Sequence, residues 1–570
     1  MTSTARERVA DLEARFGDPY DDANPLGYAA VLAADERGEL PAEGERMLDD
    51  FCLNAEFVPQ ALGGRLTQAD EMALVLRSVF RRDCALGLGY GITNYIAAAP
   101  VWASGSAPQQ LWMADLLLAG GKAAAGYNEL AHGNDFTRVE LAATRHGDDL
   151  VLDGGKQVVN NLARADAAVF LARTSAAAGP RSHSHVLVDL RDLPGDRHRR
   201  LPRFPTAGVR GCRIGGVEFT ACPVPQDAGT GIVGGAGRAM ETVLKAFQTT
   251  RGVLPGVALG GADTQLRTVV DFALERRLYG LRVADLPYTR ATLTAAYLDL
   301  LAGDCLATTA ARALHVLPDQ TSVYTAAAKF LVPKMIQESS HALATLLGAR
   351  SYLREGPYGI FQKQLRDLPA ATFGHANSTV CLATIIPQLS QLAHRSWSGQ
   401  GAPAPAELFR FGGALPALDF GPLAVNARGA DGLAGELLAA AAEFADEPVL
   451  GALCGAFTAE LAELRERCAA LRPRERTVTA GPESFVLAER YTVVLAAAAC
   501  LGYWRHGERP GSGTGDAPAW LLGALHRLAA RLGRGAPLLP DGIESRVWDD
   551  LTHRHEERLS FDTAALRLAG

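Results

Sequence analysis

The chain has 570 residues, of which 48% are hydrophobic and 21% are charged, and its formal net charge is -7 at pH 7. This balance is typical of a globular protein rather than a disordered or fibrous one, and the length indicates two to four structural units. The acidic balance offers no basic field for a nucleic-acid backbone, and no stretch approaches the ~20 apolar residues of a membrane span.

The first 16 residues are charged throughout and have no apolar core, so they do not have the pattern of a signal peptide. The nine cysteines, from Cys52 to Cys500, are scattered and never form a C-x-x-C pair. Scattered single cysteines fit buried, reduced thiols. We therefore expect a cytoplasmic protein.

Residues 1–122 are helical in pattern. Within 70–82, apolar residues recur at i, i+3, i+4, i+7 and i+8, namely Met72, Val75, Leu76, Val79 and Phe80. This spacing places them on one face of a helix. Thr67 is the expected N-cap of that helix, with Asp70 in its first turn.

Residues 123–230 change to short apolar runs separated by turn residues, which indicates a compact β-domain. The strand-like runs are 150–152, 156–159, 167–172, 186–190 and 216–220. Asp153-Gly154-Gly155 is expected to form a turn between the first two runs.

Helical spacing returns from about 235 to 396. The glycine-rich segment 231–237 lacks the spacing and the βαβ surroundings of a dinucleotide-binding loop, so we expect a flexible turn before a helix. The Gly-, Ala- and Pro-rich segment 399–405 is expected to be a linker. Residues 397–570 are again mainly helical, with a loop expected at 507–517.

Several short motifs are informative because of their order. Gly126-Tyr-Asn-Glu-Leu-Ala-His-Gly-Asn-Asp135 precedes Asp153-Gly-Gly-Lys-Gln-Val-Val-Asn-Asn161. Later come Gly208-Val-Arg-Gly211, Ala273-Leu-Glu-Arg-Arg-Leu-Tyr-Gly280, and Leu347-Gly-Ala-Arg350 with Arg366-Asp367. On these motifs, the chain resembles the acyl-CoA dehydrogenase superfamily over about residues 55–395.

The resemblance implies an α+β fold and FAD as the cofactor. The expected parts are an N-terminal helical domain (1–122), a central β-barrel domain that contacts the flavin (123–230), a four-helix bundle (231–396) and an additional helical C-terminal domain (397–570). Some larger relatives carry a similar last domain that packs across a dimer. We therefore expect 397–570 to be structural.

The family's flavin positions can be transferred one at a time. Tyr127 and Asn128 fall where backbone and a threonine side chain hold the flavin ring. Asn134 stands where a serine lies at the flavin and the pantetheine arm of the substrate. Asn160 replaces a flavin-contacting threonine and can still donate a hydrogen bond. Val158 replaces a tryptophan that covers one flavin face, so that face is expected to be more open.

Five further positions are assigned to cofactor binding by the same resemblance. Arg276 and Tyr279 match the family's Arg and Phe, which contact the FAD of a neighbouring subunit. Charge pairing with pyrophosphate explains the arginine. Gly133, Gly348 and Asn377 belong to, or follow, matched motifs. These positions imply a homodimer or homotetramer.

The family removes an α-proton with a glutamate, which this chain lacks at both known places. The usual place, eight residues beyond the Asp of the R-D motif, is occupied by His375. The place used by some relatives, just before the conserved helix Arg251, is occupied by Thr250. We assign His375 to catalysis, and Asn134, Thr250 and Arg251 to the substrate.

Three explanations of the missing glutamate are open. His375 can be the base, because an imidazole with a pKa of ~6.5 suits proton transfer at neutral pH. The substrate can instead lose CO2, which forms the enolate without a protein base. Alternatively, the flavin activates O2, as in hydroxylating relatives, and His375 only positions the substrate.

We therefore expect an FAD-dependent oxidoreductase of specialised metabolism. Its substrate would be an acyl thioester, carried by CoA or an acyl carrier protein, or a related acid. An electron acceptor or O2 would reoxidise the flavin. The alternatives are a decarboxylase-dehydrogenase-monooxygenase that forms an epoxyketone from a β-keto acid, as in antibiotic biosynthesis, and a flavin-free scaffold. No metal site is expected, because neither close histidine pair, His183/His185 or His553/His555, has a third ligand at the usual spacing.

Overall fold

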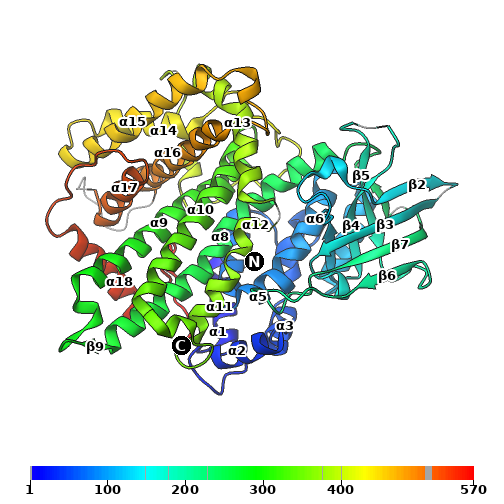
Figure 1. Cartoon of the computed structure of the whole chain (residues 1–570), viewed down its shortest axis with the longest axis horizontal. Coiled ribbons are helices and arrows are strands. Elements are labelled where there is room, and N and C mark those ends of the chain that lie inside the picture. Colours follow the sequence, from blue (N-terminus) through cyan, green and yellow to red (C-terminus); the bar gives the residue numbers. More distant parts are fainter. Residues whose placement is uncertain are drawn as a thin grey trace.

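The computed structural model (Figure 1) describes residues 3–147, 149–177, 179–227, 229–374, 376–399, 401–507 and 517–570. The first part of the chain is helical. Its helices are α1 (Ala5–Phe16), α2 (Tyr28–Arg37), α3 (Ala42–Asp50), α4 (Ala69–Arg82), α5 (Cys84–Leu86), α6 (Thr93–Ser104) and α7 (Ala107–Leu118). The apolar face expected at 70–82 is the buried face of α4. The N-cap of α4 is Gln68, so the expected cap at Thr67 is wrong by one residue.

The next part of the chain forms one mixed sheet. Its described strands run in the order β6-β7-β3-β2-β4-β5-β8, and β1 pairs in parallel with β4. The strands are β1 (Ala123–Gly126), β2 (Ala142–His146), β3 (Asp149–Val159), β4 (Ala167–Arg173), β5 (His183–Asp189), β6 (His198–Leu201), β7 (Gly215–Val224) and β8 (Gly231–Val233). The strands enclose an apolar core of their own, in which Phe170 meets Phe219 edge-on.

Two glycine-rich segments differ from their expected turns. Asp153-Gly154-Gly155 continues β3 as a bulge against β7, so the expected turn there is wrong. Gly154 has a φ of +107°, which glycine adopts without strain, and the bulge therefore forms inside the strand. The segment Gly231–Val233 pairs with β5 as strand β8, and only the residues after it form the expected turn.

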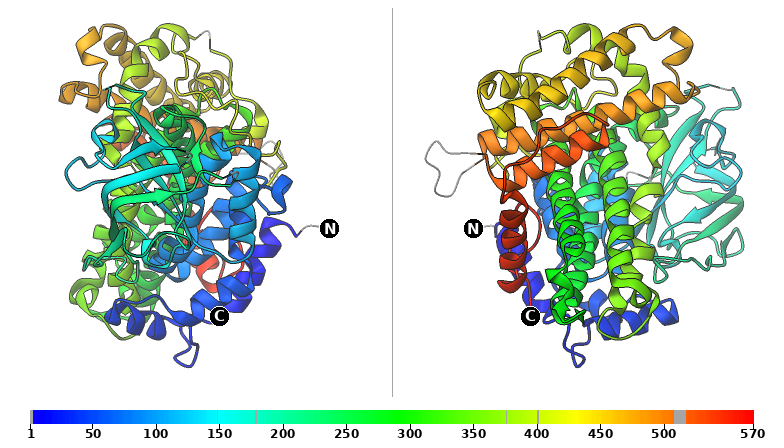
Figure 2. Two further views of the ribbon diagram at one scale, coloured as in Figure 1. Left: turned by 90° about the vertical axis from the view of Figure 1, so that its right-hand side faces the viewer. Right: turned by 60° about the vertical axis from the view of Figure 1, so that its left-hand side comes forward.

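Long helices follow the sheet and pack along one another, as Figure 2 shows. They include α8 (Ala239–Glu275), α9 (Pro287–Val316), α10 (Thr321–Leu347) and α13 (Ser378–Arg395), with the short helices α11 (Gly359–Asp367) and α12 (Ala370–Phe373) between the last two. A small hairpin of β9 (Arg277–Leu278) and β10 (Leu281–Arg282) connects α8 to α9. This helical array forms the wall that faces the sheet.

The C-terminal part adds α14 (Gly432–Glu443), α15 (Pro448–Ala469), α16 (Pro482–His506), α17 (Ala519–Arg531) and α18 (Ile543–Glu556). By length and composition α16 could span a membrane, yet 78% of its most apolar window is buried inside the protein. We expected no segment of membrane-spanning length here, because Glu489 and Arg490 interrupt the apolar run of α16. Most of the loop expected at 507–517 lies outside the described residues.

The chain ends by returning to its N-terminal helices, where the Ala569 N–H donates to Glu13 Oε2 of α1 at 3.3 Å. Asp562 accepts a hydrogen bond from Arg77 Nη1 at 2.8 Å, and Arg77 Nη2 also bonds Asp304 at 2.6 Å. Phe561 is fully buried beneath the Arg267 guanidinium, 4.2 Å from the ring centre. A buried charge network therefore fastens the last segment to α4, α8 and α9.

Candidate active site

A cavity of about 380 Å³ lies between the sheet and the helices. Its sheet side consists of the segment after β1 and the end of β3, and its helical side of residues from α4, α6, α8 and α10. The segment 367–374, which contains α12, closes a further side. The volume lies within the roughly 300–1,000 Å³ of typical ligand pockets.

Residues from two separate sequence blocks meet on the sheet side of this cavity. Those assigned to the cofactor and found here are Tyr127, Asn128, Gly133, Asn134, Val158 and Asn160. A β-bridge between Asn128 and Val158 holds the two blocks side by side. The Asn160 amide donates from Nδ2 to Thr93 Oγ1 at 2.8 Å, while its Oδ1 is buried without a hydrogen-bond partner among the described residues. A buried acceptor of this kind calls for a donor from a bound group.

This arrangement fits the flavin that the sequence motifs imply. The side-chain amides of Asn128, Asn134 and Asn160 offer both donors and acceptors to the nitrogen and oxygen atoms along the edge of a flavin ring. Val158 presents only a small side chain to the same space. These residues could therefore hold the flavin ring of FAD.

A buried ion pair shapes the segment that carries Asn128 and Asn134. Lys156 Nζ donates to Glu129 Oε1 at 2.8 Å and to the Tyr127 carbonyl at 3.1 Å. Burial on its own would raise the pKa of Glu129, but Lys156 and two backbone N–H groups outweigh it and lower that pKa. Burial lowers the pKa of Lys156 to about 8, against the attraction of Glu129. The pair fixes the backbone beside the cavity.

The helical side of the cavity is apolar apart from Thr93 of α6 and Lys329 of α10. Residues from α4, α6 and α8 supply this wall, including Phe80, Ile96, Leu254, Val257 and Ala258. Such a surface releases water when it meets hydrocarbon, at about 25 cal/mol for each Å² buried. The cavity therefore combines an amide-rich side with a side suited to an acyl chain.

The carboxylates that line the cavity among the described residues, Glu129 and Asp367, are both engaged. Asp367 accepts hydrogen bonds from Lys363 Nζ at 2.6 Å and from the Val209 N–H at 2.5 Å. Burial raises the pKa of Asp367, against the positive charge of Lys363. Either carboxylate would have to leave a buried ion pair before it could act as a base.

Only one of the two positions where the family places its catalytic base lies next to a described residue that lines the cavity. His375 lies outside the described residues, but Gly374, directly before it, lines the cavity. Thr250 and Arg251 are buried in α8 and are not among the described lining residues. The Thr250 hydroxyl donates to the Phe247 carbonyl at 3.2 Å, and the Arg251 guanidinium lies 5.6 Å from the Phe247 ring centre.

The remaining residues assigned to the cofactor lie elsewhere. Asn377 caps α13 by accepting a hydrogen bond from the Val380 N–H at 3.0 Å. Arg276 and Gly348 are exposed at the ends of α8 and α10, and Tyr279 in the hairpin is 94% exposed. A single copy of the chain therefore does not bring Arg276, Tyr279 or Gly348 to the cavity.

Lys329 is a cavity residue that sequence reasoning missed. Its side chain extends from α10, is fully buried, and donates from Nζ to the carbonyls of Gly374, at 3.1 Å, and of Ala371. These bonds fasten the segment that leads into His375. A lone lysine in the apolar run 325–333 was the signal available in the sequence.

Replacing Lys329 by methionine is expected to change how stability depends on pH. Burial lowers the pKa of Lys329 from 10.5 to about 8, so the folded protein binds this proton more weakly than the unfolded chain. The buried cation therefore costs stability below pH about 8, and this cost disappears as pH rises from about 8 to 10.5. Relative to the variant, the wild type should gain stability across that window in thermal unfolding.

Lys334→Met is the matched control, because Lys334 lies on the same helix with its side chain 40% exposed. Because this control keeps Lys329, we expect its stability to follow the wild-type pH profile between pH 8 and 10.5. Parallel pH profiles for the wild type and Lys329→Met would contradict the assignment.

Comparison with protein families gives two matches. Residues 124–222 match the acyl-CoA dehydrogenase middle domain, and residues 237–389 match the acyl-CoA dehydrogenase C-terminal domain. The human (Homo sapiens) mitochondrial short-chain specific acyl-CoA dehydrogenase is 25% identical over 334 residues, 58% of this chain and 79% of that protein. The glutaryl-CoA dehydrogenase of Desulfococcus multivorans is 23% identical over 383 residues, 67% of this chain and 92% of that protein.

Solved structures share the fold over about two thirds of the chain. A glutaryl-CoA dehydrogenase complex with glutaryl-CoA has a TM-score of 0.60 at 21% identity, covering 69% of this chain and 95% of that one. The prolyl acyl carrier protein oxidase AnaB has a TM-score of 0.59 at 16% identity, covering 67% and 97%. PigA with FAD and proline has a TM-score of 0.58 at 16% identity, covering 67% and 96%.

Proposed function

Because the chain belongs to the acyl-CoA dehydrogenase superfamily and uses FAD, we propose that it oxidises an acyl thioester bound in the cavity. The observation that carries this proposal is the two-sided cavity itself. Amide groups of Asn128, Asn134 and Asn160 line one side, and apolar side chains of α4, α6 and α8 line another. A flavin ring and an acyl chain need these two surfaces face to face.

When bound, FAD supplies the acceptor for the two electrons and the hydrogen that leave the substrate. The protein's own task is to orient both partners and to remove the α-proton. The amides of Asn128 and Asn160 would orient the ring edge, while the apolar wall at Leu254 and Val257 would keep water from the reacting carbons. We assign the proton transfer to His375, since the described carboxylates of the cavity are held in ion pairs.

The proposed substrate is a thioester carried by CoA or by an acyl carrier protein. AnaB is a prolyl acyl carrier protein oxidase and PigA has been seen with proline, and both share the fold of this chain. These neighbours support a role in specialised metabolism with a carrier-bound substrate. Incubating matched CoA and carrier-bound thioesters and following the products by mass tests the proposal. A product two hydrogens lighter, without loss of CO2, is the expected result.

A decarboxylating monooxygenase is the second candidate. Two features favour it: the cavity shows no unengaged carboxylate among its described residues, and Val158 leaves space where the family has a tryptophan. In that reaction a β-keto acid would lose CO2 to form the enolate. One O2 would then leave one oxygen atom in the epoxide and take up two hydrogens of the substrate as water. Desaturation that proceeds anaerobically with an added electron acceptor and without CO2 release would exclude this candidate.

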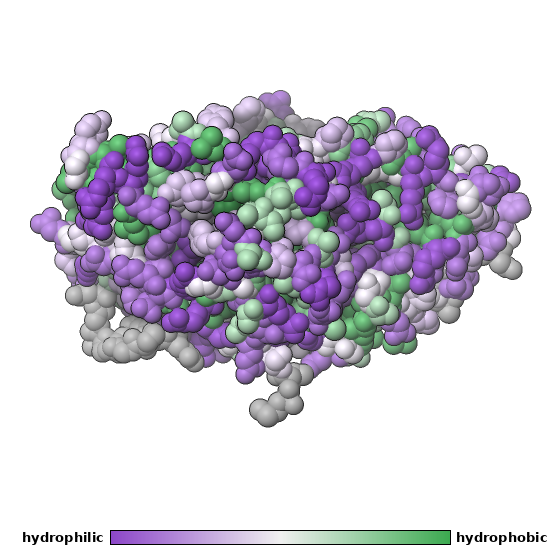
Figure 3. Space-filling view, turned by 90° about the horizontal axis from the view of Figure 1, so that it is seen from below, coloured by the Kyte–Doolittle hydropathy of each residue, from purple (hydrophilic) through white to green (hydrophobic). Residues whose placement is uncertain are grey.

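We also propose a homodimer, because one end of the molecule exposes apolar side chains. Apolar areas also interrupt the hydrophilic surface seen from below in Figure 3. The exposed apolar side chains near the hairpin and the end of α10 are Leu278, Tyr279, Leu281, Tyr352 and Leu353. Covering them with a second copy would bring Arg276 and Tyr279 of one subunit to the cofactor of the other.

Tyr279→Ser is expected to weaken the dimer by about 2 kcal/mol, roughly 30-fold in Kd, as a central interface aromatic does. The variant should also retain less FAD on dilution. Analytical ultracentrifugation with flavin detection measures both effects. Leu538→Ser removes an equally exposed apolar side chain elsewhere, since both residues are 94% exposed, and should leave the dimer unchanged. A monomeric wild type at all concentrations would disprove this assembly.

A further inference from the structure

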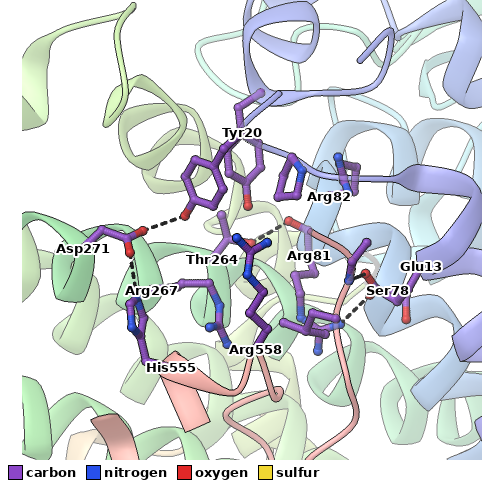
Figure 4. A pocket seen from close by; sticks show the side chains of 14 residues that line it. Glu13, Tyr20, Ser78, Arg81, Arg82, Thr264, Arg267, Asp271, His555 and Arg558 are labelled. Carbon is purple, nitrogen blue, oxygen red and sulfur yellow. Dashed lines mark hydrogen bonds and ion pairs between the residues drawn. The ribbon is translucent and has the colours of Figure 1, made fainter. Parts of the chain in front are cut away.

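A second cavity, of about 120 Å³, lies where the two ends of the chain meet (Figure 4). Its walls come from α1, α2 with the segment before it, α4, α8, α18 and the last residues of the chain. Among the described residues, none that lines it also lines the active-site cavity. This cavity therefore has no part in the proposed oxidation.

Arginines dominate the lining. Those that face the cavity are Arg81, Arg82, Arg267 and Arg558, against the carboxylates of Glu13 and Asp271. Asp271 is already engaged, because it accepts from the Tyr20 hydroxyl at 2.7 Å and pairs with His555 Nε2 at 2.6 Å (Figure 4). The lining thus carries more positive than negative groups.

Acidic residues around the cavity, including Asp18 at 3.9 Å from Arg558, offset this charge. Glu13 pairs with Arg81 Nη1 at 3.1 Å. Asp263 Oδ2 lies 3.4 Å from Arg81 Nε, and Asp562 Oδ2 lies 3.5 Å from Arg81 Nη2. These longer contacts hold the guanidinium in place without giving every N–H a hydrogen-bond acceptor.

Three polar groups of the lining have no hydrogen-bond partner among the described residues. They are Ser78 Oγ, Arg81 Nε and Arg267 Nε, and all three atoms are buried. Arg81 Nε makes only the ion-pair contact with Asp263 at 3.4 Å. Their side chains belong to residues that are 1%, 8% and 9% exposed. A buried donor without an acceptor is costly, so such groups normally meet a bound molecule. Their occurrence around one cavity points to a ligand rich in acceptors.

We propose that this cavity binds a small oxyanion, such as phosphate or a carboxylate. A guanidinium has only donors, and its fork matches the oxygens of phosphate and carboxylate groups. The cavity is far smaller than the roughly 300 Å³ at which cofactor-sized pockets begin, so the ligand is a single small anion. Once bound, it bridges α4 and α8 to the final segment of the chain and stabilises their contact.

Inorganic phosphate is the first probe, used on the full-length, flavin-loaded protein. Calorimetric titration should show saturable binding, and phosphate should raise Tm above that in sodium chloride of equal ionic strength. Ser78→Ala and Arg558→Gln should each weaken binding at least about tenfold, since each removes a group of the lining. Arg474→Gln is the control, because Arg474 is an exposed arginine whose side chain is 74% accessible. That control should bind phosphate like the wild type.

Acetate, titrated in parallel, distinguishes a carboxylate from a tetrahedral oxyanion, and saturable binding of either supports the site. Flavin content and circular dichroism show whether each variant is folded, and Ser78→Ala removes only one oxygen atom. The proposal is overturned if phosphate, acetate and chloride of equal ionic strength give the same Tm. It is equally overturned if both variants bind with wild-type affinity, since the cavity then holds only water.

Discussion

Replacing His375 by alanine is expected to slow the oxidation of the thioester by about 10²- to 10⁴-fold, the contribution of a positioned general base. The chain has no glutamate at either place where its family keeps the base, and His375 and Thr250 stand there instead. Thr250 is buried with its hydroxyl bonded to a backbone carbonyl, whereas the residue before His375 lines the cavity. His375 is therefore the group to which the proton transfer is assigned.

Single-turnover reduction of the bound flavin measures this effect, because it separates the chemical step from binding and product release. His375→Gln should be as slow as His375→Ala, since an amide can hydrogen bond but cannot accept the proton. His553→Ala, which changes an exposed histidine on α18, should react like the wild type. An unchanged chemical step in His375→Ala would rule out this residue as the base and favour decarboxylation.

Asp562→Ala should lower the free energy of unfolding by about 3–5 kcal/mol, as expected when one partner of a buried ion pair is removed. The Asp562 side chain is 2% exposed and holds Arg77 at 2.8 Å, with Arg81 at 3.5 Å. Without it, Arg77 keeps Asp304 but loses its second carboxylate, and the final segment loses its main polar contact with α4. Urea unfolding and hydrogen exchange of residues 559–570 measure the loss.

The pH dependence of this loss has a defined sign. Burial on its own would raise the pKa of Asp562, but Arg77 and Arg81 outweigh it and hold that pKa well below its usual value of 3.8. The stabilisation is therefore fully present above pH about 3.8 and is lost as pH falls further. The difference between wild type and variant should shrink in acid. Asp541→Ala, at an exposed site before α18, should change stability little at any pH.

Order along the chain made the fold and part of the cavity lining predictable. Tyr127, Asn128 and Asn160 belong to motifs whose spacing is kept, and the Asn128–Val158 bridge brings those motifs together in the cavity. Local rules failed where tertiary contacts decide. Gly154-Gly155, a pair that signals a turn, forms a bulge because β3 pairs with β7 on both sides of it. The apolar helix α16 is part of the core because other helices surround it.

Contacts between distant residues left no trace in the sequence patterns. Lys329 was missed because it bonds the backbone carbonyls of Ala371 and Gly374. Every residue type has such a carbonyl, so the sequence does not mark these partners. The ion pair of Arg77 with Asp562 joins residues 485 positions apart, so no spacing rule connects them. Exposed Tyr279 and Arg276 were assigned through family resemblance alone, and their test requires a second copy of the chain.

Anaerobic titration of the FAD-loaded protein with acyl thioesters tests the proposed function most directly. We predict that a thioester bleaches the visible absorption of the oxidised flavin, and that the product is two hydrogens lighter with its carboxyl carbons retained. A protein that takes up FAD but is reduced by no CoA- or carrier-bound thioester would contradict the account.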